Sequence, residues 1–376
     1  MPSAPFSIVD VFSATAYKGN PLAVVDARGQ DLTDTQMKLI TRQFNLSETT
    51  FFFRPTLPGA DFKLRSFLPY GWEVYGAGHN ILGVWWHLAH ANLLDFSTST
   101  PDNKKRAGGG WSSTAAEVEE EEFTFHQELG GEVIPVKVIR RHRQKKKKER
   151  TSETDPTTTN GTTSDNLFTI AIRQASPKSH AVPPDRSAIA AVLGLSASDI
   201  GFRSTPKLLP QIMSTSTTHH LLVPVSSVDA LNRAVVSRDK LVQQLDLLDS
   251  RAHGVFWFTP VAPTAASGSD GSIPTFHARF FSRGMTAEDP ATGSAAGPLA
   301  AYLYRNGVLP GKLDEEGKKA KILVYQGLKL GRECVIEVRL AVRGGEEEEE
   351  LEVDIVGGGV EVARGEIGLP ALSTTF

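Results

Sequence analysis

The sequence predicts an α+β protein made of two similar domains. Segments typical of β-strands outnumber segments typical of helices, and the two kinds do not alternate in the regular order of a doubly wound parallel sheet. One strand-turn-helix segment occurs twice along the chain. The length of 376 residues is enough for two domains of ordinary size, so a duplicated fold accounts for both the length and the repeat.

The strand segments are recognised by their β-branched and aromatic residues. They span residues 6–12, 22–27, 49–55, 61–67, 122–127, 133–139, 167–173, 254–260, 276–282, 321–327, 334–340 and 351–357. The helical segments instead show apolar residues at spacings of three and four, and Thr33 caps the first of them. They span residues 33–44, 79–94, 185–195, 239–249 and 294–307.

The domain boundaries follow from one segment whose composition is not that of a folded domain. Residues 140–166 are basic and then rich in threonine, with almost no apolar side chains, so we expect a disordered insertion or linker. The first domain is then expected over residues 1–139 and the second over residues 167–358, with a last strand near residues 359–370 returning to the first. The lysine run at 145–148 is more typical of a solvated insertion than of a nuclear signal or an RNA-binding patch, because no aromatic residues are interleaved with it.

Composition excludes several classes of protein. A net charge of -3 gives no overall attraction to nucleic acid or to an anionic membrane, so neither partner is expected. The single cysteine, Cys334, excludes an internal disulfide, a cysteine-rich zinc site and a two-thiol mechanism within one chain. The first residues lack the features of a signal peptide and no apolar run approaches a membrane span, so a cytoplasmic protein is expected. His219, His220 and His253 lack the spacing of metal ligands, so no metal is expected and surface or core roles are favoured.

The repeated segment begins at Arg65 in one copy and at Arg279 in the other. Each copy has Arg-x-Phe, an acidic residue, a glycine followed by a polar residue, an apolar helix and then Asn-x-x-Leu. Asn92 follows Arg65 at the same spacing as Asn306 follows Arg279, with one residue slipped before the glycine. The two copies indicate a pseudo-twofold fold.

The glycine-polar step of each copy falls where a helix begins, at Gly78-His79 and at Gly293-Ser294. The first N–H groups of a helix have no partner within that helix and carry partial positive charge. Two helix starts that face each other between domains would bind a small anion such as a carboxylate. The expected partner is therefore a small carboxylic acid.

Six motifs, in order along the chain, resemble the phenazine-biosynthesis isomerase-like (PhzF-like) family. They are DVFSATAYKGNPLAVV, LSETTFFF, EVYGAGH, EDPATGSAAGPLAAYL, VYQGLKLGR and VGGGVEVARGEI. The resemblance implies the diaminopimelate-epimerase fold, in which two pseudo-twofold related α+β domains each wrap a curved, barrel-like sheet around a central helix. It also implies an isomerase with its active site between the domains, assembled as a homodimer.

The resemblance further implies three catalytic residues. Glu48, in the SETT motif, is the implied acid/base, and His79 and Asp289 are implied to share in proton movement. Burial raises the pKa of a carboxyl group, which suits Glu48 to proton transfer near neutral pH. Taken singly, these residues are typical of a strand-edge acid, a helix cap and a turn former; their joint occurrence in the family's order favours catalysis. Glu73 and Glu288 are expected to be structural or to support the site.

The substrate-binding residues are implied in the same way. Gly78, Gly293 and Ser294 are implied to hold the substrate carboxylate through backbone donors at the two helix starts. Asn20, in the KGNP motif, matches a residue that lies near the site and is included as a substrate-binding residue.

The single cysteine limits the reactions that the protein could catalyse. Two cysteines act as acid and base in enzymes similar to diaminopimelate epimerase and proline racemase, and the corresponding positions here are Gly78 and Ser294, so two-thiol racemisation is excluded. Cofactor-independent proton transfer within a small, aromatic or unsaturated acid is then expected. Two alternatives stay open: a lyase that eliminates from a related acid, and a non-catalytic binding protein of the same fold. Trp72 and Tyr75 favour an acid with aromatic character if they line the site, although they could also fill core.

Overall fold

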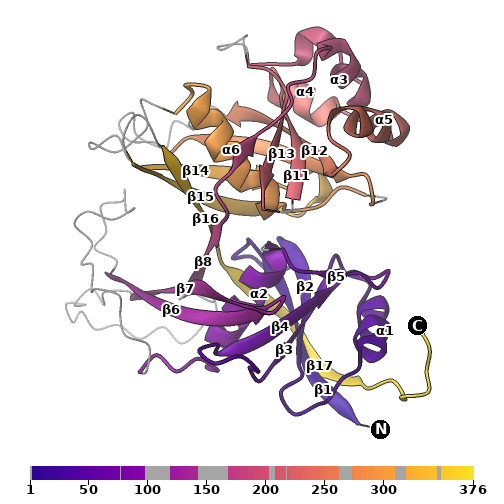
Figure 1. The fold of residues 1–376 in the computed structure, drawn as a ribbon, viewed down its shortest axis with the longest axis vertical. Helices are drawn as coiled ribbons and strands as arrows, with labels where there is room; N and C mark the ends of the chain where they lie inside the picture. The colour runs from indigo at the N-terminus through magenta and orange to yellow at the C-terminus, as the bar shows by residue number, and fades with distance from the viewer. Residues whose placement is uncertain are drawn as a thin grey trace, which may run out of the picture.

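The computed structural model describes residues 2–76, 78–97, 119–142, 168–202, 208–216, 218–261, 273–285, 287–309, 319–344 and 349–376. These residues form two lobes that follow one another along the longest axis of the molecule (Figure 1). All the described strands belong to one hydrogen-bonded network. Among the described helices, none is both long and apolar enough to cross a membrane.

The first half of the chain supplies most of one lobe. Its strands are β1 (Ser3–Val11), β2 (Asn20–Asp26), β3 (Thr49–Phe53), β4 (Phe62–Phe67), β5 (Glu73–Val74), β6 (Glu119–Leu129), β7 (Glu132–His142) and β8 (Phe168–Gln174), and its helices are α1 (Asp34–Phe44) and α2 (His79–His90). The last strand of the chain, β17 (Gly359–Gly368), returns to this lobe and pairs antiparallel with β1.

The second half supplies the other lobe. Its strands are β9 (Lys178–Ser179), β10 (Gln211–Thr215), β11 (Thr218–Pro224), β12 (Ala252–Val261), β13 (Thr275–Ser282), β14 (Lys319–Gln326), β15 (Cys334–Arg343) and β16 (Glu350–Gly357). Its helices are α3 (Arg186–Val192), α4 (Val228–Arg233), α5 (Arg238–Leu248) and α6 (Gly293–Arg305), and short 3-10 turns lie at Ala197–Asp199 and Leu328–Leu330.

The two lobes repeat the same strand topology. In the first, β1 pairs antiparallel with β2, β2 runs parallel to β3, β3 is antiparallel to β4, and β4 is parallel to β6. Strands β10, β11, β12, β13 and β14 pair in the same sequence of orientations. The strand that follows each repeat pairs with the first strand of the other repeat. Strand β9, after the first repeat, pairs with β10, and β17, after the second repeat, pairs with β1. The pseudo-twofold relation predicted from the repeated segment is therefore visible in the strand order.

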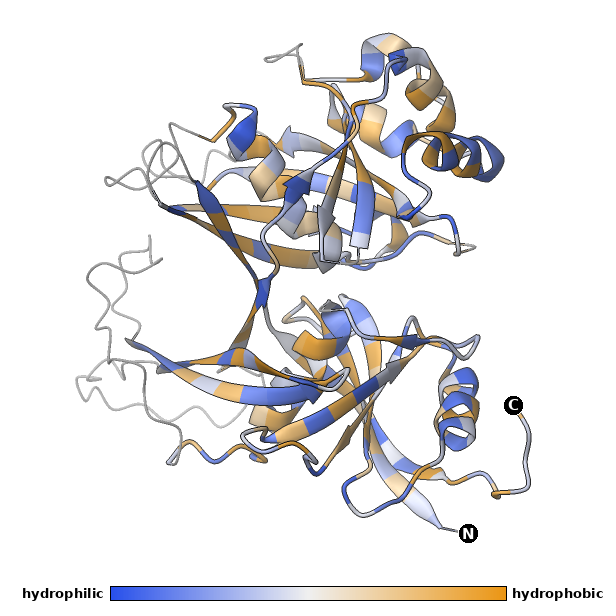
Figure 2. Cartoon of the chain, in the orientation of Figure 1, coloured by the Kyte–Doolittle hydropathy of each residue, from blue (hydrophilic) through white to orange (hydrophobic). Residues whose placement is uncertain are grey.

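One helix of each lobe is enclosed by strands. Helices α2 and α6 bury nearly every residue, and their apolar side chains join a single core that runs through both lobes. Figure 2 shows orange and pale stretches in these two helices, interrupted by a few blue residues, whereas α1 and α5 carry longer hydrophilic stretches. Helix α1 covers a second cluster on the outer face of the first lobe, and α3, α4 and α5 cover a third on the second lobe. The enclosed position of α2 and α6 brings their N-terminal ends together.

Several expected elements match the structure and others differ. Helix α1 begins after Thr33, which caps it through a hydrogen bond to the backbone N–H of Gln36, as predicted. Strands β10 and β11 were not predicted. Strand β7 continues to His142, three residues into the segment expected to be disordered, because cross-strand ion pairs from Glu120 and Glu121 hold Arg141 and Arg140. The rest of that segment, residues 143–166, lies outside the described residues, and the domain boundaries stay a prediction.

Candidate active site

The first turns of α2 and α6 approach each other closely between the lobes. A Cβ atom placed on Gly293 would lie 3.8 Å from the Cα atom of Gly78 and 3.5 Å from a methyl group of Ile355. Neither helix start has a side-chain cap, so the first backbone N–H groups of both helices are left for another partner. The absence of side chains at Gly78 and Gly293 lets the two backbones approach each other closely at the helix starts.

The start of α6 is held in place by two buried glutamines. Gln326, at the end of β14, donates to the backbone oxygen of Asp289 and accepts a hydrogen bond from the backbone N–H of Thr292, at 2.7 and 3.0 Å. Gln174, at the end of β8, donates to the backbone oxygen of Gly293 at 3.0 Å. These bonds fix the backbone on both sides of the helix start.

Glu48 and His79 face each other at this point. Glu48 immediately precedes β3, and His79 is the first residue of α2. Oε2 of Glu48 lies 3.2 Å from Nε2 of His79, and among the described residues neither atom has a hydrogen-bond partner. The Glu48 side chain is 20% exposed and the His79 side chain 6%. Two buried polar atoms without partners are uncommon in a folded protein, and they are typical of a site that receives a ligand.

Asp289 is bound from both lobes. Its Oδ1 accepts a hydrogen bond of 2.8 Å from Asn20 at the start of β2, and its Oδ2 accepts one of 2.6 Å from Thr292. The second amide hydrogen of Asn20 goes to the backbone oxygen of Ala291 at 3.2 Å. Both amide hydrogens of Asn20 are therefore used within the protein, and a direct contact between Asn20 and a substrate stays a prediction.

Burial shifts the pKa of all three candidate catalytic groups. It raises the pKa of Glu48 to about 7 and lowers the pKa of His79 to about 4, because each charged form is poorly solvated there. Burial also raises the pKa of Asp289 to about 6, against the opposing effects of the His79 ring and the Thr292 hydroxyl. Burial thus favours the uncharged form of both Glu48 and His79.

The internal repeat contains an arginine clamp in each lobe. Arg65 of β4 donates through Nε and Nη2 to the two carboxylate oxygens of Glu73, at 2.7 and 2.6 Å. Arg279 of β13 binds both carboxylate oxygens of Glu288 in the same way. Each pair connects a strand to the loop that leads to a site helix. Glu73 and Glu288 therefore hold these loops.

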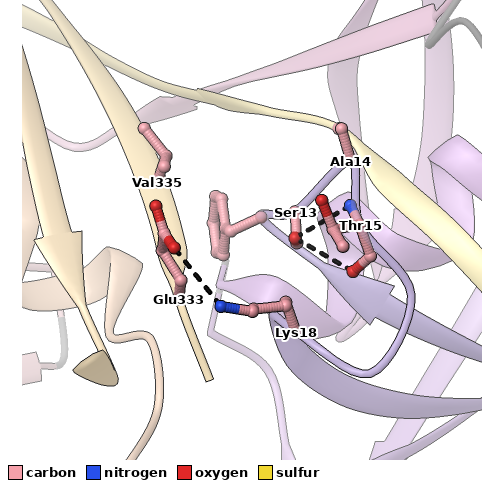
Figure 3. A pocket seen from close by; sticks show the side chains of 8 residues that line it. Ser13, Ala14, Thr15, Lys18, Glu333 and Val335 are labelled. Carbon is pink, nitrogen blue, oxygen red and sulfur yellow. Dashed lines mark hydrogen bonds and ion pairs between the residues drawn. The ribbon is translucent and has the colours of Figure 1, made fainter. Parts of the chain in front are cut away.

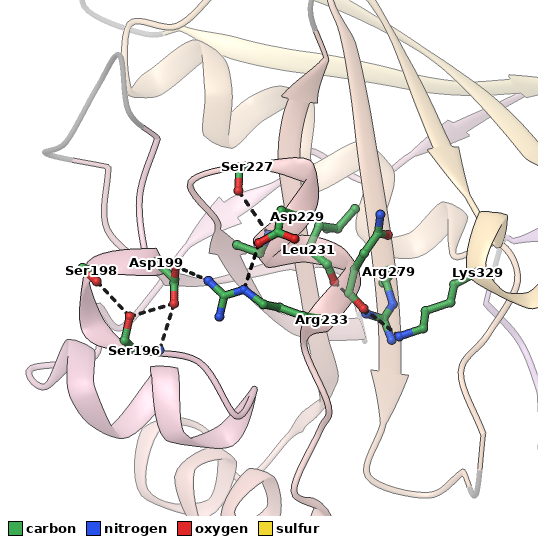
Figure 4. A network of polar contacts seen from close by, with 11 residues as sticks. Ser196, Ser198, Asp199, Ser227, Asp229, Leu231, Arg233, Arg279 and Lys329 are labelled. Carbon is green, nitrogen blue, oxygen red and sulfur yellow. Dashed lines mark hydrogen bonds and ion pairs between the residues drawn. The ribbon is translucent and has the colours of Figure 1, made fainter.

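Arg279 also binds the C-terminal end of α4. Its Nη1 donates to the backbone oxygens of Leu231, Asn232 and Ala234, and its guanidinium lies 4.7 Å from the ring centre of Trp257. Figure 4 shows Arg279 and Lys329 reaching the segment around Leu231. The loop before Asp289 is in this way tied to the outer helices of the second lobe.

A groove lies beside the contact between the lobes. It has a volume of about 500 Å³ and is lined in part by Phe12, Thr15 and Val335. Figure 3 shows Lys18 of the first lobe reaching Glu333 of the second across this groove, at 3.5 Å. The lining residues include none of the expected catalytic or substrate-binding residues, but Phe12 joins the groove to the helix starts, since its ring also lies 3.8 Å from the Cβ position of Gly293.

Three aromatic side chains are exposed around the turn before α2. Tyr70, Trp72 and Tyr75 are 53%, 72% and 59% exposed, so they do not fill the core. The rings of Tyr70 and Trp72 meet edge to face at 6.1 Å. The charge of Glu48 contributes to a raised pKa of Tyr70, after burial as the larger cause, which places Tyr70 near the candidate acid/base.

The described residues offer no cluster of three or more histidine, cysteine, aspartate or glutamate side chains placed to hold a metal ion. Cys334 is fully buried at the start of β15, and burial raises the pKa of its thiol. Cys334 therefore belongs to the core.

Sequence reasoning missed several polar residues that contact the site, among them Gln326 and His220. Gln326 lies in the motif VYQGLKLGR, but nothing in the sequence assigned it a role at α6. His220, in β11, lies with its Nε2 atom 3.0 Å from Oγ of Ser294. The apolar run LLVPV that follows His220 was a usable strand signal, which the preceding threonines and Pro224 obscured.

The geometry defines a class of protein: two duplicated α+β lobes with a buried carboxyl group and two opposed helix starts between them. A family model described as "Phenazine biosynthesis-like protein" matches residues 9–365. The chain belongs to this family. The family and the fold class that the six motifs predicted are confirmed.

Individual relatives agree with this assignment. An uncharacterized isomerase of Bacillus subtilis is 24% identical over 338 residues, covering 89% of this chain and 90% of the relative. The trans-2,3-dihydro-3-hydroxyanthranilate isomerase of Pseudomonas fluorescens is 28% identical over 366 residues, covering 97% and 99%. The crystal structure of a PhzF-family phenazine biosynthesis protein from Bacillus anthracis matches with a TM-score of 0.69 at 21% identity, covering 98% of this chain and 100% of that one. The expected enzyme class, an isomerase of the PhzF-like type, is confirmed.

Proposed function

We propose that this protein is a cofactor-independent isomerase that moves a proton between two carbon positions of a small unsaturated or aromatic carboxylic acid, with Glu48 as the acid/base. The observation that carries the proposal is the Glu48 carboxyl group: its Oε2 atom is buried 3.2 Å from Nε2 of His79 at the start of α2, and burial raises its pKa to about 7. A group with this pKa can both accept and return a proton near neutral pH.

The proposed steps use residues that already lie together. The substrate carboxylate binds the backbone N–H groups at Gly78 and Gly293 and the hydroxyl of Ser294. Deprotonated Glu48 then takes a proton from carbon: the C–H bond breaks, an O–H bond forms on Glu48, and the electron pair shifts a double bond along the conjugated system. Glu48 finally returns the proton to a second carbon. Uncharged His79 and hydrogen-bonded Asp289 face the same space and are proposed to bind the polar substituents of the substrate.

The substrate class has support from a relative. The Pseudomonas fluorescens enzyme, which matches almost the full length of this chain, is named for an isomerisation of trans-2,3-dihydro-3-hydroxyanthranilate. That compound is a cyclic, unsaturated acid with an amine and a hydroxyl group. The exposed aromatic residues Tyr70 and Trp72 beside the site would suit a planar or ring-containing acid of the same kind.

The test is proton NMR of the purified protein in deuterated water. The probes are trans-2,3-dihydro-3-hydroxyanthranilate and a panel of small unsaturated amino and hydroxy acids. Wild type is compared with Glu48→Gln and with Glu333→Gln, a matched change in an exposed acid outside the site. We expect deuterium incorporation and double-bond movement with wild type and Glu333→Gln, and loss of both with Glu48→Gln.

Other outcomes would change the proposal in defined ways. Exchange that persists in Glu48→Gln would remove Glu48 as the acid/base and move the role to His79 or Asp289. Loss of water or ammonia from a substrate, without exchange into an isomer, would replace isomerisation by elimination. No reaction of any probe with wild type would overturn the proposed substrate class.

A further inference from the structure

The side chain of Ser294 contacts a buried histidine, His220. Its Oγ lies 3.0 Å from Nε2 of His220, which projects from β11 toward the first turn of α6. His220 is 3% exposed, and its ring meets the edge of Phe280 at 5.1 Å and 86°. Ser294 itself follows Gly293, whose backbone faces Gly78. The histidine therefore contacts the hydroxyl in the first turn of α6, whereas the hydroxyl of Thr292 before it is bound to Asp289.

The surroundings of the other ring nitrogen decide which way this hydrogen bond runs. Nδ1 of His220 is buried, and it has no hydrogen-bond partner among the described residues. A buried N–H group without an acceptor is rarer in proteins than a buried acceptor without a donor. Burial also lowers the pKa of His220 to about 3, so the ring is neutral and carries one hydrogen. That hydrogen is accordingly assigned to Nε2, where Ser294 can accept it.

We propose that His220 is a positioning residue that donates its Nε2 hydrogen to Oγ of Ser294 and so leaves the Ser294 hydroxyl hydrogen to donate to a substrate carboxylate. If the bond ran the other way, Ser294 would use its hydrogen on the ring and present lone pairs to the anion, which would repel it. His220 thus determines that the Ser294 hydroxyl acts as a hydrogen-bond donor toward the substrate. This inference rests on the proposed function in one respect, the placement of a carboxylate at the two helix starts.

The proposal is tested with a pair of ligands that differ in charge at one group. Anthranilate carries a carboxylate, and anthranilamide has the same ring and amine with a neutral amide. Affinities of both are measured by isothermal titration calorimetry for wild type, His220→Leu, His220→Gln, Ser294→Ala and the double variant His220→Leu/Ser294→Ala. His219→Leu is the matched control, since His219 is a buried histidine of the same strand whose partner is Asp249. Thermal unfolding of each variant is recorded alongside.

We expect His220→Leu and Ser294→Ala each to weaken the binding of anthranilate by about 10- to 100-fold. This is the factor expected for the loss of one hydrogen bond to a charged group. Binding of anthranilamide should change little. The double variant should bind anthranilate no more weakly than either single variant, because both changes remove the same interaction. His220→Gln should retain most of the affinity, since its amide can donate to Ser294, and His219→Leu should retain the preference for anthranilate.

Three results would overturn the proposal. Equal weakening of both ligands in His220→Leu would show that the histidine supports the fold and not the polarity of Ser294. Additive losses in the double variant would show that the two residues act separately. Failure of wild type to bind anthranilate would remove the anion site itself. In contrast, normal discrimination between the ligands with no proton exchange on any substrate would overturn the proposed isomerisation and leave this inference intact.

Discussion

Oε2 of Glu48 and Nε2 of His79 lie 3.2 Å apart, and neither atom is hydrogen-bonded to a described residue. Burial disfavours an ion pair between the two groups, because it lowers the pKa of His79 to about 4 and raises that of Glu48 to about 7. Leaving buried polar atoms without partners costs stability, and proteins tolerate this cost mainly where function requires it. We therefore expect the pair to bind a substrate that offers both a donor and an acceptor.

The pKa of Glu48 predicts the pH dependence of the reaction. Glu48 must be deprotonated to take the first proton, so kcat/KM is expected to rise with pH up to about 7 and to level off above it. The measurement is a pH profile with the substrate found by proton exchange. Glu48→Asp should keep an ionisation on this limb, at a lower maximal rate. A flat profile between about pH 5 and pH 9 would contradict the assignment of Glu48 as base.

The same pKa predicts how Glu48 affects stability. Its value is about 7 in the folded protein, against an ordinary value of 4.5, so between these values the folded state binds more protons than the unfolded state. The stability contributed by the protonated carboxyl is present at low pH and is lost as the pH rises through about 7. Glu48→Gln stays neutral, so it should be more stable than wild type by up to about 3 kcal/mol at pH 8, with little difference at pH 5.

Urea unfolding at the two pH values measures this difference. The comparison of wild type with Glu48→Gln isolates the carboxyl group, because the other titrating residues are common to both proteins. A gap in the free energy of unfolding that is the same at both pH values would show that the pKa of Glu48 is not shifted by burial.

The arginine clamp of the second lobe predicts a large loss of stability. The Arg279 side chain is 7% exposed and binds Glu288, three backbone oxygens and the face of Trp257. Arg279→Met leaves the partly buried Glu288 carboxylate without its cation, and we expect it to lower the free energy of unfolding by about 3 to 5 kcal/mol. Arg343→Met is the control, because the Arg343 side chain is 62% exposed and its partner Glu352 keeps Arg173 as a second cation, so it should have no measurable effect. Equal effects of the two changes would show that Arg279 has no structural role.

Short sequence patterns predicted the helix starts, because those depend on residues close together in the chain. Thr33 begins α1 because its capping hydrogen bonds involve residues within one turn, and α2 and α6 follow the glycine-polar steps of the repeated segment. Strands β10 and β11 were missed because their threonines and histidines are polar and become buried only through tertiary contacts with β12 and α6. Propensity alone does not contain those contacts.

The candidate site was predictable to the extent that ordered motifs carry it. Glu48, His79 and Asp289 came from three motifs far apart in the chain, and the fold brings all three to the contact between the lobes. Their supporting partners were not predictable. His220 lies 74 residues before Ser294, and Asn20 lies 269 residues before Asp289, so each pairing depends on which strand ends meet which helix start. That information exists in the duplicated topology and not in any local pattern.

The space between the two helix starts predicts a change that removes binding without removing the fold. A methyl group at Gly293 would meet its nearest neighbours at 3.5 Å or more, and the backbone there does not have a positive φ, so Gly293→Ala should fold normally. The same methyl group would stand in the space where we propose the substrate carboxylate binds. We expect the thermal unfolding midpoint to stay close to that of wild type and anthranilate binding to fall below detection in calorimetry.

Gly297→Ala, one turn further along the same helix, is the comparison variant that should lower stability. A Cβ atom there would lie 1.8 Å from Oε1 of Gln174, whose amide nitrogen holds the backbone oxygen of Gly293. The added methyl group must displace Gln174, and overpacking of this kind costs about 1 to 3 kcal/mol. Gly297→Ala should therefore lower the unfolding midpoint, whereas Gly293→Ala should lower affinity. If Gly293→Ala binds anthranilate as well as wild type does, the carboxylate lies elsewhere, and the opposed helix starts are then a packing contact between the lobes.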